Sequence, residues 1–388
     1  MKRMTGAILT ILFLYSLCTA AYAANTQPPN ADALGLSAKS AVLMDQATGK
    51  ILFEKNGREK LNPASVTKIM SLLLFVEAME DGRLRLQDSV TATREAVEKG
   101  GSQIWLKEGE QMTVDELMRA TAIGSANDAC TALAVKLAGS EAAFVRKMNE
   151  RAKQLGMRDT VFENCTGLDN DTEAHQTTAV DIARMSRALL SHEKIRDYTT
   201  VWMDSLRGGK TQLVNTNKLV RFYSGTTGLK TGTTNKAGCC ISASAKRKEI
   251  HLIAVVMHAP SSADRFADAK TMLDWGFASF ESVTPSFNPA ALHAVPVRRG
   301  IAQTVEVEQP KLQKLLLKTG EKEKLQTAIS LAEDVFAPVE QGQQLGTLTV
   351  TLDGKTIAQY PLCAAAAVRA RTLWDAFSRL LSALRMRA

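Results

Sequence analysis

Ser65 and Lys68 have the residue types and the spacing that nucleophilic catalysis requires. They stand three residues apart within residues 62–70, NPASVTKIM, and a helix that begins here places both side chains on one face, about 5–6 Å apart. A serine hydroxyl is a weak nucleophile until a neighbouring base takes its proton, and a lysine serves as that base when burial disfavours its charged form. An isolated S-x-x-K pair is more commonly a helix-capping serine and a solvated lysine. Other parts of the chain must therefore decide between the two interpretations.

Two later motifs complete a set. Ser125-Ala-Asn127 lies in a small polar break between two predicted helices, and Lys230-Thr-Gly232 lies on a predicted strand. The combination of S-x-x-K, S-D-N and K-T-G is known from enzymes that form an acyl intermediate on serine, and here alanine fills the middle of the second motif. Each motif alone carries little information. The three together, in this order and on a helix, a break and a strand, favour the catalytic interpretation of Ser65.

The sequence around the motifs predicts a mixed α/β domain. Apolar runs that flank turns predict strands at residues 40–45, 51–54, 240–245 and 250–257. Apolar periodicity and capping residues predict helices at residues 66–79, from Thr113, from Ala129, at 140–155, from Thr178 and at 264–280. Because strands stand at both ends with helices between them, we expect one mixed antiparallel sheet with a helical subdomain.

The two ends of this region differ in character. Residues 1–23 combine Lys2 and Arg3, a short apolar run and Ala21-Tyr-Ala23, which predicts a cleaved signal peptide better than a membrane helix. A polar leader follows at residues 24–36, and the catalytic domain is predicted over residues 37–284. From about residue 285 the helical pattern fades, and short strand patterns at 294–297, 304–307, 314–318 and 348–352 predict a small all-β domain over residues 285–362.

Residues 363–388 are predicted to end in an amphipathic helix. At 100° per residue, the apolar side chains that include Leu373, Trp374 and Phe377 fall in one arc of about 120°, opposite an arginine-rich face. Such a helix, over residues 368–388, suits the membrane interface, and the alternative is a helix packed on a domain. With the signal peptide, this predicts an exported protein held peripherally at the outer face of the cytoplasmic membrane.

Charge and cysteine content argue against a nucleic-acid-binding protein, a disulfide-stabilised protein and a zinc protein. The formal net charge is +8, and removing the two cations of residues 1–23 and the net four of residues 363–388 leaves +2. A nearly neutral, exported body argues against a nucleic-acid partner. The five cysteines beyond residue 23 form neither a disulfide framework nor a zinc pattern, so we expect buried free thiols and neither metal nor cofactor.

With its three motifs, signal, all-β domain and tail, the chain resembles the low-molecular-mass penicillin-binding proteins of the serine D-alanyl-D-alanine carboxypeptidase family, peptidase family S11. The resemblance covers essentially the whole chain. It implies a β-lactamase/transpeptidase-like fold and a hydrolase that removes the terminal D-alanine from peptidoglycan pentapeptides during cell-wall maturation. It also implies covalent inhibition by β-lactam antibiotics.

The resemblance also assigns roles. Ser65 is the expected nucleophile, Lys68 its general base and Ser125 a proton relay to the leaving D-alanine. The substrate-binding residues that it implies are Asn127, Lys230, Thr231, Gly232, Thr233 and Arg265. The backbone N–H groups of Ser65 and Thr233 are the expected oxyanion hole, and Arg265 is expected to order the side that faces the substrate carboxylate.

Two positions depart from the family pattern. Thr233 stands where some relatives have histidine, which removes a titrating group, and Cys165 stands where relatives often have proline.

Three alternative functions stay open: a β-lactamase with a deacylating base near residues 173–175, an endopeptidase that acts on crosslinks, and an inactive envelope protein that binds through residues 285–362. A Ser-His-Asp hydrolase has no support, because the chain contains no G-x-S-x-G.

Overall fold

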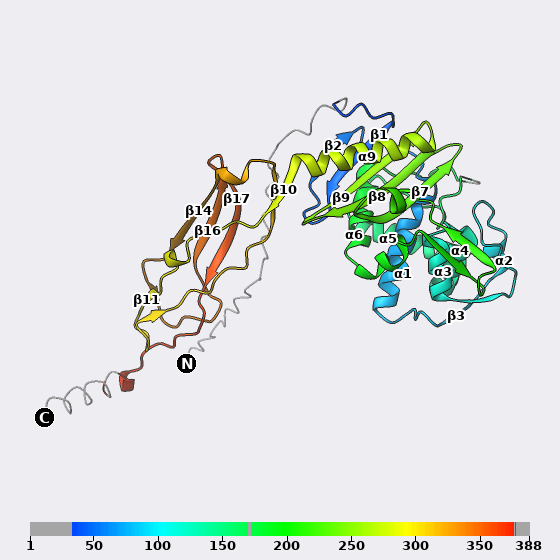
Figure 1. Cartoon of the computed structure of the whole chain (residues 1–388). Helices are drawn as coiled ribbons and strands as arrows, with labels where there is room; N and C mark the ends of the chain where they lie inside the picture. The colour runs from blue at the N-terminus through cyan, green and yellow to red at the C-terminus, as the bar shows by residue number, and fades with distance from the viewer. Residues whose placement is uncertain (1–32, 170–171, 376, 378–388) are drawn as a thin grey trace, which may run out of the picture. The chain divides into compact units, whose positions relative to one another are not determined.

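The structure is a computed structural model that describes residues 33–169, 172–375 and 377 (Figure 1). The predicted signal peptide, most of the leader and most of the predicted tail helix lie outside these residues. The described chain divides into two compact units. One runs to Ser282 and includes Leu316–Thr319, and the other comprises Val283–Leu315 and the chain from Gly320 onward. Each unit is considered separately below.

A five-stranded antiparallel sheet forms the centre of the first unit. Its order is β2-β1-β9-β8-β7, and the strands are β1 Ser40–Asp45, β2 Ile51–Lys55, β7 Thr226–Thr234, β8 Gly238–Arg247 and β9 Ile250–Ala259. The first predicted strand pairs with the last, with Val42 opposite Val255. The shared sheet expected from the sequence is therefore confirmed.

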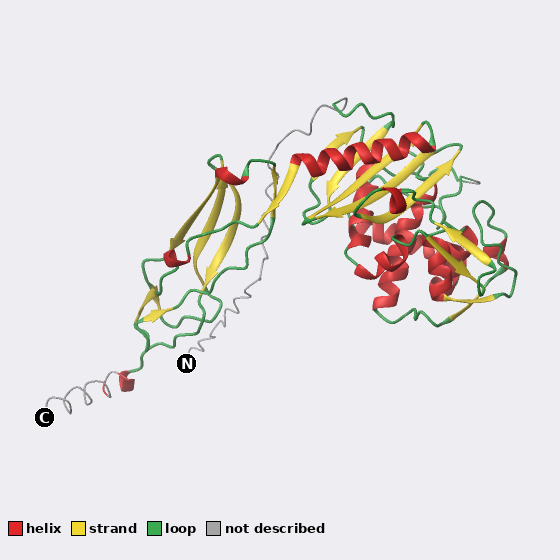
Figure 2. Ribbon diagram, in the orientation of Figure 1, coloured by secondary structure: helices red, strands yellow, loops and turns green. Residues whose placement is uncertain are grey.

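Helices cover both faces of this sheet (Figure 2). Helix α9, Ser262–Ser279, lies on one face, and α1, Lys68–Glu80, and α6, Ala179–Leu190, lie on the other. Strand β9 supplies both cores, because Leu252, Ala254 and Val256 pack in the cluster that includes α9, whereas alternate residues face the helical subdomain. A strand buried on both faces is apolar at nearly every position, as β9 is.

Capping residues place the helices of the subdomain. Thr113 and Glu116 form the predicted capping box of α3, Val114–Ala122, and the hydroxyls of Ser140 and Thr178 cap the two predicted helices that follow them. Helix α4 begins at Asn127, two residues before the predicted start. Helix α5, Glu141–Gln154, is the helix that Ser140 caps. The remaining elements are short: the helices α2 Arg94–Val97, α7 Arg196–Thr199 and α8 Leu219–Phe222, and two two-stranded sheets, β3 Ser89–Thr91 with β4 Gln111–Thr113 and β5 Met203–Leu206 with β6 Thr211–Val214.

The second unit is built from strands, as predicted. One three-stranded sheet contains β11 Val295–Arg298, β12 Thr304–Val305 and β15 Val335–Phe336, and another contains β14 Leu325–Leu331, β16 Gln344–Leu352 and β17 Lys355–Cys363. The segment 314–318, expected in this domain, forms β13, Leu315–Lys318, which pairs with β10, Phe280–Val283. Leu316 packs against the apolar cluster beside α9, which explains why this strand groups with the first unit.

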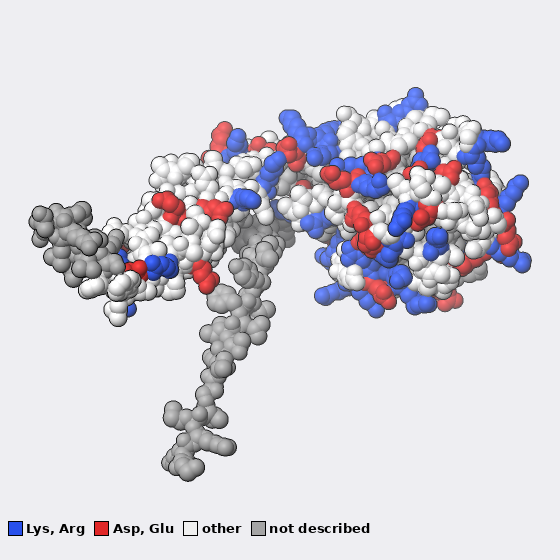
Figure 3. Space-filling model, turned by 90° about the horizontal axis from the view of Figure 1, so that it is seen from below, with Lys and Arg blue, Asp and Glu red and all other residues white. Residues whose placement is uncertain are grey.

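The surface carries charges of both signs. On the face shown in Figure 3, Lys and Arg side chains are interspersed with Asp and Glu side chains over the described chain. Within residues 33–169 and 172–375, no helix combines the length and the apolar character needed to cross a bilayer.

Candidate active site

The nucleophile turn lies where the chain enters α1. Residues Ala64–Thr67 form a 3-10 turn that leads directly into α1 at Lys68. Ala64 is fully buried and has a left-handed backbone, with φ of 47°. The Lys68 Nζ atom donates a hydrogen bond to Ser65 Oγ at 2.9 Å. The predicted Ser65–Lys68 pair is therefore in direct contact, which is the geometry that proton transfer needs.

Lys68 is fully buried and surrounded by acceptors. Its Nζ atom also donates to Asn127 Oδ1 at 2.5 Å and to the Thr166 carbonyl at 3.0 Å. Burial lowers the pKa of Lys68 from its ordinary value of 10.5 to about 8. At pH 7 about a tenth of an amine with a pKa near 8 is neutral, far more than of an ordinary lysine, so Lys68 can act as a general base.

The second motif joins the site through tight backbone packing. Ser125 is 4% exposed and has φ of 62°, and Asn127 is 2% exposed. The Asn127 side chain donates to the Gly100 carbonyl at 2.9 Å, and its backbone N–H donates to the Ser102 carbonyl at 2.7 Å. A Cβ atom at Gly101 would lie 2.7 Å from Asn127 Nδ2. The loop at residues 100–102 therefore fixes the amide that contacts Lys68.

The third motif lies on β7, the edge strand of the sheet. A Cβ atom at Gly232 would lie 2.8 Å from both the Pro63 carbonyl oxygen and the Ser65 backbone nitrogen, and 2.9 Å from the nitrogen of Val66. Only glycine allows this approach. It brings the backbone of β7 against the nucleophile turn, so residues more than 160 positions apart in the sequence line one site.

Three basic side chains, those of Lys68, Lys230 and Arg265, lie close together in the site. Lys230 is 1% exposed and donates to the Thr231 carbonyl at 3.0 Å, and Thr231 Oγ1 donates to Thr216 Oγ1 at 2.7 Å. Burial, and then the charges of Lys68 and Arg265, hold the pKa of Lys230 well below its ordinary value. Like charges held together in a buried site favour an anionic ligand.

Arg265 reaches β7 from α9 and is 7% exposed, so it is not a surface arginine. Its Nη1 atom donates to the Gly232 carbonyl at 2.9 Å and to Thr233 Oγ1 at 2.8 Å. The Nε atom is buried without a protein partner among the described residues, and burial lowers the pKa of the guanidinium. Arg265 thus holds the end of the strand that carries Thr233.

Sequence reasoning considered His175 only within a possible β-lactamase base at residues 173–175, and it did not predict the contact of His175 with the nucleophile turn. Its Nδ1 atom accepts a hydrogen bond from the Glu163 backbone N–H at 3.1 Å, so Nε2 carries the proton and donates to Thr67 Oγ1 at 2.8 Å. Burial lowers the pKa of His175 to about 4, which keeps the ring neutral. His175 therefore braces the nucleophile turn, while Glu173 is exposed. No motif indicates this contact, because Thr67 and His175 meet only in the folded chain.

Cys165 is a structural loop residue. Its backbone N–H donates to Glu141 Oε1 at 3.1 Å, and its carbonyl accepts from Ser71 Oγ at 2.6 Å. The thiol is buried, and burial raises its pKa well above the ordinary value. Cys130, Cys165, Cys239 and Cys240 are all free and buried, as expected, and Cys363 is half-buried.

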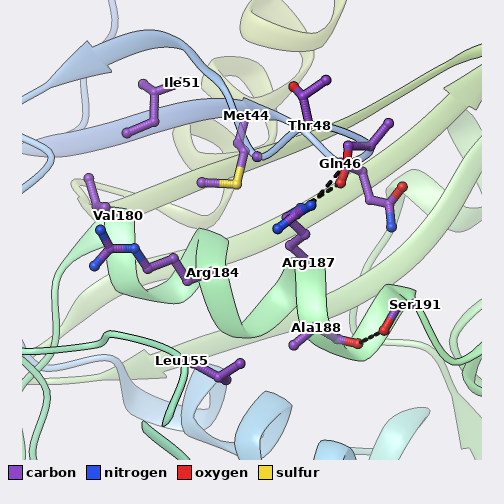
Figure 4. A pocket seen from close by; sticks show the side chains of 12 residues that line it. Met44, Gln46, Thr48, Ile51, Leu155, Val180, Arg184, Arg187, Ala188 and Ser191 are labelled. Atoms are coloured by element: carbon purple, nitrogen blue, oxygen red, sulfur yellow. Dashed lines mark hydrogen bonds between the residues drawn. The ribbon is translucent and has the colours of Figure 1, made fainter. Parts of the chain in front are cut away.

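A separate pocket of about 680 Å³ lies between the β1–β2 turn and α6 (Figure 4). Both arginines that line it form hydrogen bonds within the protein. Arg187 donates to the carbonyls of Gln46 and Ala47, and Arg184 donates to the Gly156 carbonyl and to Asp181. None of the motif residues lines it.

Among the described residues, no group of three or more His, Cys, Asp or Glu side chains is placed to hold a metal ion.

The fold and the three motifs define a serine acyl-transfer enzyme of the penicillin-recognising class. The family model for D-alanyl-D-alanine carboxypeptidase matches residues 24–261, and the model for the C-terminal domain of penicillin-binding protein 5 matches residues 280–370. The chain belongs to the D-alanyl-D-alanine carboxypeptidase family, as the resemblance implied.

Individual relatives agree with this assignment. The chain is 39% identical to the D-alanyl-D-alanine carboxypeptidase DacF of Bacillus subtilis over 94% of each chain. The structure of penicillin-binding protein 5 from Haemophilus influenzae superimposes with a TM-score of 0.75 at 28% identity, covering 88% of this chain and 99% of that one. Ampicillin-bound penicillin-binding protein D2 from Listeria monocytogenes gives a TM-score of 0.58 at 31% identity, covering 62% and 98%.

Proposed function

We propose that this protein is a serine D-Ala-D-Ala carboxypeptidase that removes the terminal D-alanine from peptidoglycan stem pentapeptides. The observation that carries the proposal is the buried Lys68 amine between Ser65 Oγ and Asn127 Oδ1, beside a strand that touches the nucleophile turn at Gly232. Family membership supplies the substrate class.

Acylation begins when Lys68 takes the Ser65 hydroxyl proton and Ser65 Oγ attacks the carbonyl of the penultimate D-alanine. The tetrahedral oxyanion accepts hydrogen bonds from the backbone N–H groups of Ser65 and Thr233, which together act as the oxyanion hole. The C–N bond then breaks, and Ser125 passes the proton to the nitrogen of the leaving D-alanine. An acyl ester on Ser65 results. Water attacks this ester while Lys68 takes a proton from the water, the bond between the acyl carbon and Ser65 Oγ breaks, and Lys68 returns the proton to Ser65 as the tetrapeptide leaves.

Substrate binding falls to the remaining motif residues. Asn127 holds the amide of the penultimate D-alanine and keeps Lys68 in place. Lys230, Thr231 and Thr233 face the terminal carboxylate, and the guanidinium of Arg265 orders that side through Thr233. The three basic groups support this assignment, because a substrate carboxylate would offset their mutual repulsion and the leaving group carries that carboxylate away.

A β-lactam resembles the substrate at the reacting amide, so it acylates Ser65 and blocks the enzyme.

We also propose that the catalytic domain spans residues 37–284, that residues 1–23 direct export, and that residues 368–388 hold the protein at the outer face of the cytoplasmic membrane. Deleting residues 368–388 should move the protein from the membrane fraction to the soluble fraction. Retention on membranes would overturn the anchor proposal.

The activity is tested by mass spectrometry after incubation with benzylpenicillin and by D-alanine release from diacetyl-Lys-D-Ala-D-Ala. We expect one slowly hydrolysed penicilloyl group and D-alanine release, both absent in Ser65→Ala and both present in the control Ser191→Ala. An adduct without release would point to an endopeptidase, and rapid repeated hydrolysis of the antibiotic to a β-lactamase. No adduct at all would overturn the role of Ser65.

A further inference from the structure

Trp105 presents an exposed indole ring on the loop that borders the second motif. It is 76% exposed, more than any other large apolar residue described in the first unit. Among the described residues, no aromatic pair and no cation–π contact includes its ring. A tryptophan left in solvent contributes little to the fold.

The backbone at Trp105 is strained, with φ of 58°. The left-handed region is unfavourable for a bulky residue relative to the right-handed one, because the Cβ atom crowds the backbone there. Asparagine or glycine would occupy this position with less strain. The fold therefore keeps a tryptophan where stability favours another residue, which is a common property of functional positions.

Neighbouring side chains hold this turn in place. Asp128, fully buried on α4, accepts the backbone N–H of Ile104 at 3.2 Å and of Leu106 at 3.0 Å. Arg207, from the β5–β6 turn, donates to the Ile104 carbonyl at 2.9 Å. Ile104 and Leu106 are both buried. The residues on either side of Trp105 are thus anchored, and the tryptophan alone points out of the core.

The same loop borders the candidate active site. Asn127, whose side chain contacts Lys68, donates its backbone N–H to the Ser102 carbonyl. Three residues span at most about 11 Å, so the Trp105 backbone lies within that distance of Ser102. In the proposed reaction the terminal carboxylate lies toward Lys230, and the part of the peptide before the cleaved bond passes Asn127. The loop that carries Trp105 therefore borders the residue past which the peptide runs in the proposed reaction.

We propose that Trp105 is a specificity-determining residue that packs against the long diamino-acid side chain preceding D-Ala-D-Ala in the substrate. The proposal rests on the proposed function. The methylenes of that side chain cover the indole face, and its ammonium group gains a cation–π contact, for which indole is the best aromatic partner. A short side chain such as that of alanine reaches neither.

Selectivity between peptides tests this directly. The assay compares kcat/KM for Nα-acetyl-Lys-D-Ala-D-Ala and Nα-acetyl-Ala-D-Ala-D-Ala, with active sites counted by 6-aminopenicillanic acid, which lacks an acyl side chain. We expect Trp105→Ala to lower the Lys/Ala ratio about fivefold, as the loss of a cation–π contact and methylene packing implies. Trp105→Phe should keep most of the ratio. Acetylating the lysine Nε should remove the part of the effect that depends on charge.

Phe222→Ala is the matched control, because Phe222 is 68% exposed and lies on α8 of the same unit. Its ratio should equal that of the unaltered protein. Trp105→Asn adds a second readout, since it relieves the backbone strain and should leave the melting temperature unchanged or raise it. A fall in melting temperature with an unchanged ratio would show that Trp105 is structural and overturn the proposal.

The affinity for peptides separates the proposed role of Trp105 from the proposed carboxypeptidase function. In a Ser65→Ala background, calorimetry measures the affinity of both peptides without turnover, and adding Trp105→Ala should weaken the lysine peptide about fivefold relative to the alanine peptide. If the unaltered enzyme releases no D-alanine from any peptide, the proposed function fails while this binding ratio still decides the role of Trp105. Ratios within twofold of the reference in both assays would overturn it.

Discussion

Replacing Gly232 by alanine tests how the third motif meets the nucleophile. The added Cβ atom would lie 2.8 Å from the Ser65 nitrogen and the Pro63 carbonyl oxygen, whereas ordinary contact begins at 3.4 Å. The strand and the turn must therefore separate by about 0.6 Å, because both contacts are with backbone and neither can rotate away. The backbone conformation of Gly232 is itself open to alanine, so the effect is purely one of space.

The expected loss follows from the oxyanion hole. Its donors act when they lie about 2.7–3.1 Å from the oxyanion, and losing one donor typically lowers the rate about 10²–10³-fold, or about 2.7–4 kcal/mol. A displacement of about 0.6 Å moves one donor out of that range. We therefore expect Gly232→Ala to acylate with benzylpenicillin at least about 100-fold more slowly, as measured from the time course of the adduct by mass spectrometry.

Gly276→Ala is the control. Its Cβ atom would lie 2.6 Å from Leu252 Cδ1 and 2.8 Å from Leu43 Cδ2, so the crowding is similar but involves the ends of core side chains next to α9. This variant should lose about 1–3 kcal/mol of stability and acylate normally per folded molecule. Acylation of Gly232→Ala within threefold of the unaltered protein would refute the argument that β7 and the nucleophile turn are locked together.

Three further predictions concern charge and positioning. The acylation rate should rise about tenfold per pH unit below pH 8 and level off above it, because Lys68 must be neutral to take the Ser65 proton and its pKa is lowered to about 8. His175→Ala should slow acylation about tenfold by freeing Thr67, with partial rescue by His175→Gln, whose amide can replace the Nε2 donor, as the loss of one buried hydrogen bond implies. Arg265→Lys should raise KM for the peptide about tenfold, because lysine keeps the positive charge but lacks the planar guanidinium, which can donate two parallel hydrogen bonds.

Each of these has a contradicting outcome. A rate that stays flat between pH 6 and 9 would mean that Lys68 is not the base. A His175→Ala variant that has a lower melting temperature but acylates at the full rate would show that His175 has a purely structural role. Equal KM values for arginine and lysine at position 265 would show that the bidentate geometry contributes nothing to substrate binding.

Local patterns in the sequence determined much of the fold. Capping residues such as Thr113 and Thr178 act within one turn of the chain, so they mark helix starts without any tertiary information. Alternating or continuous apolar runs marked β1, β8 and β9 in the same way. The two-stranded sheets β3–β4 and β5–β6 were missed because their strands are three or four residues long, too short for a period to be recognised.

The sequence by itself also determined the family, because the three motifs occur in order. It predicted seven of the nine candidate site residues from those motifs, and the resemblance to the family added Thr233 and Arg265. What only the tertiary structure decided is how these motifs work together. The pKa of Lys68 depends on burial by segments far apart in the chain, and the contacts of His175 with Thr67 and of Gly232 with the nucleophile turn join residues that no local rule relates. Hydrogen bonds, packing and desolvation act through space, so their effects exist only once the chain has folded.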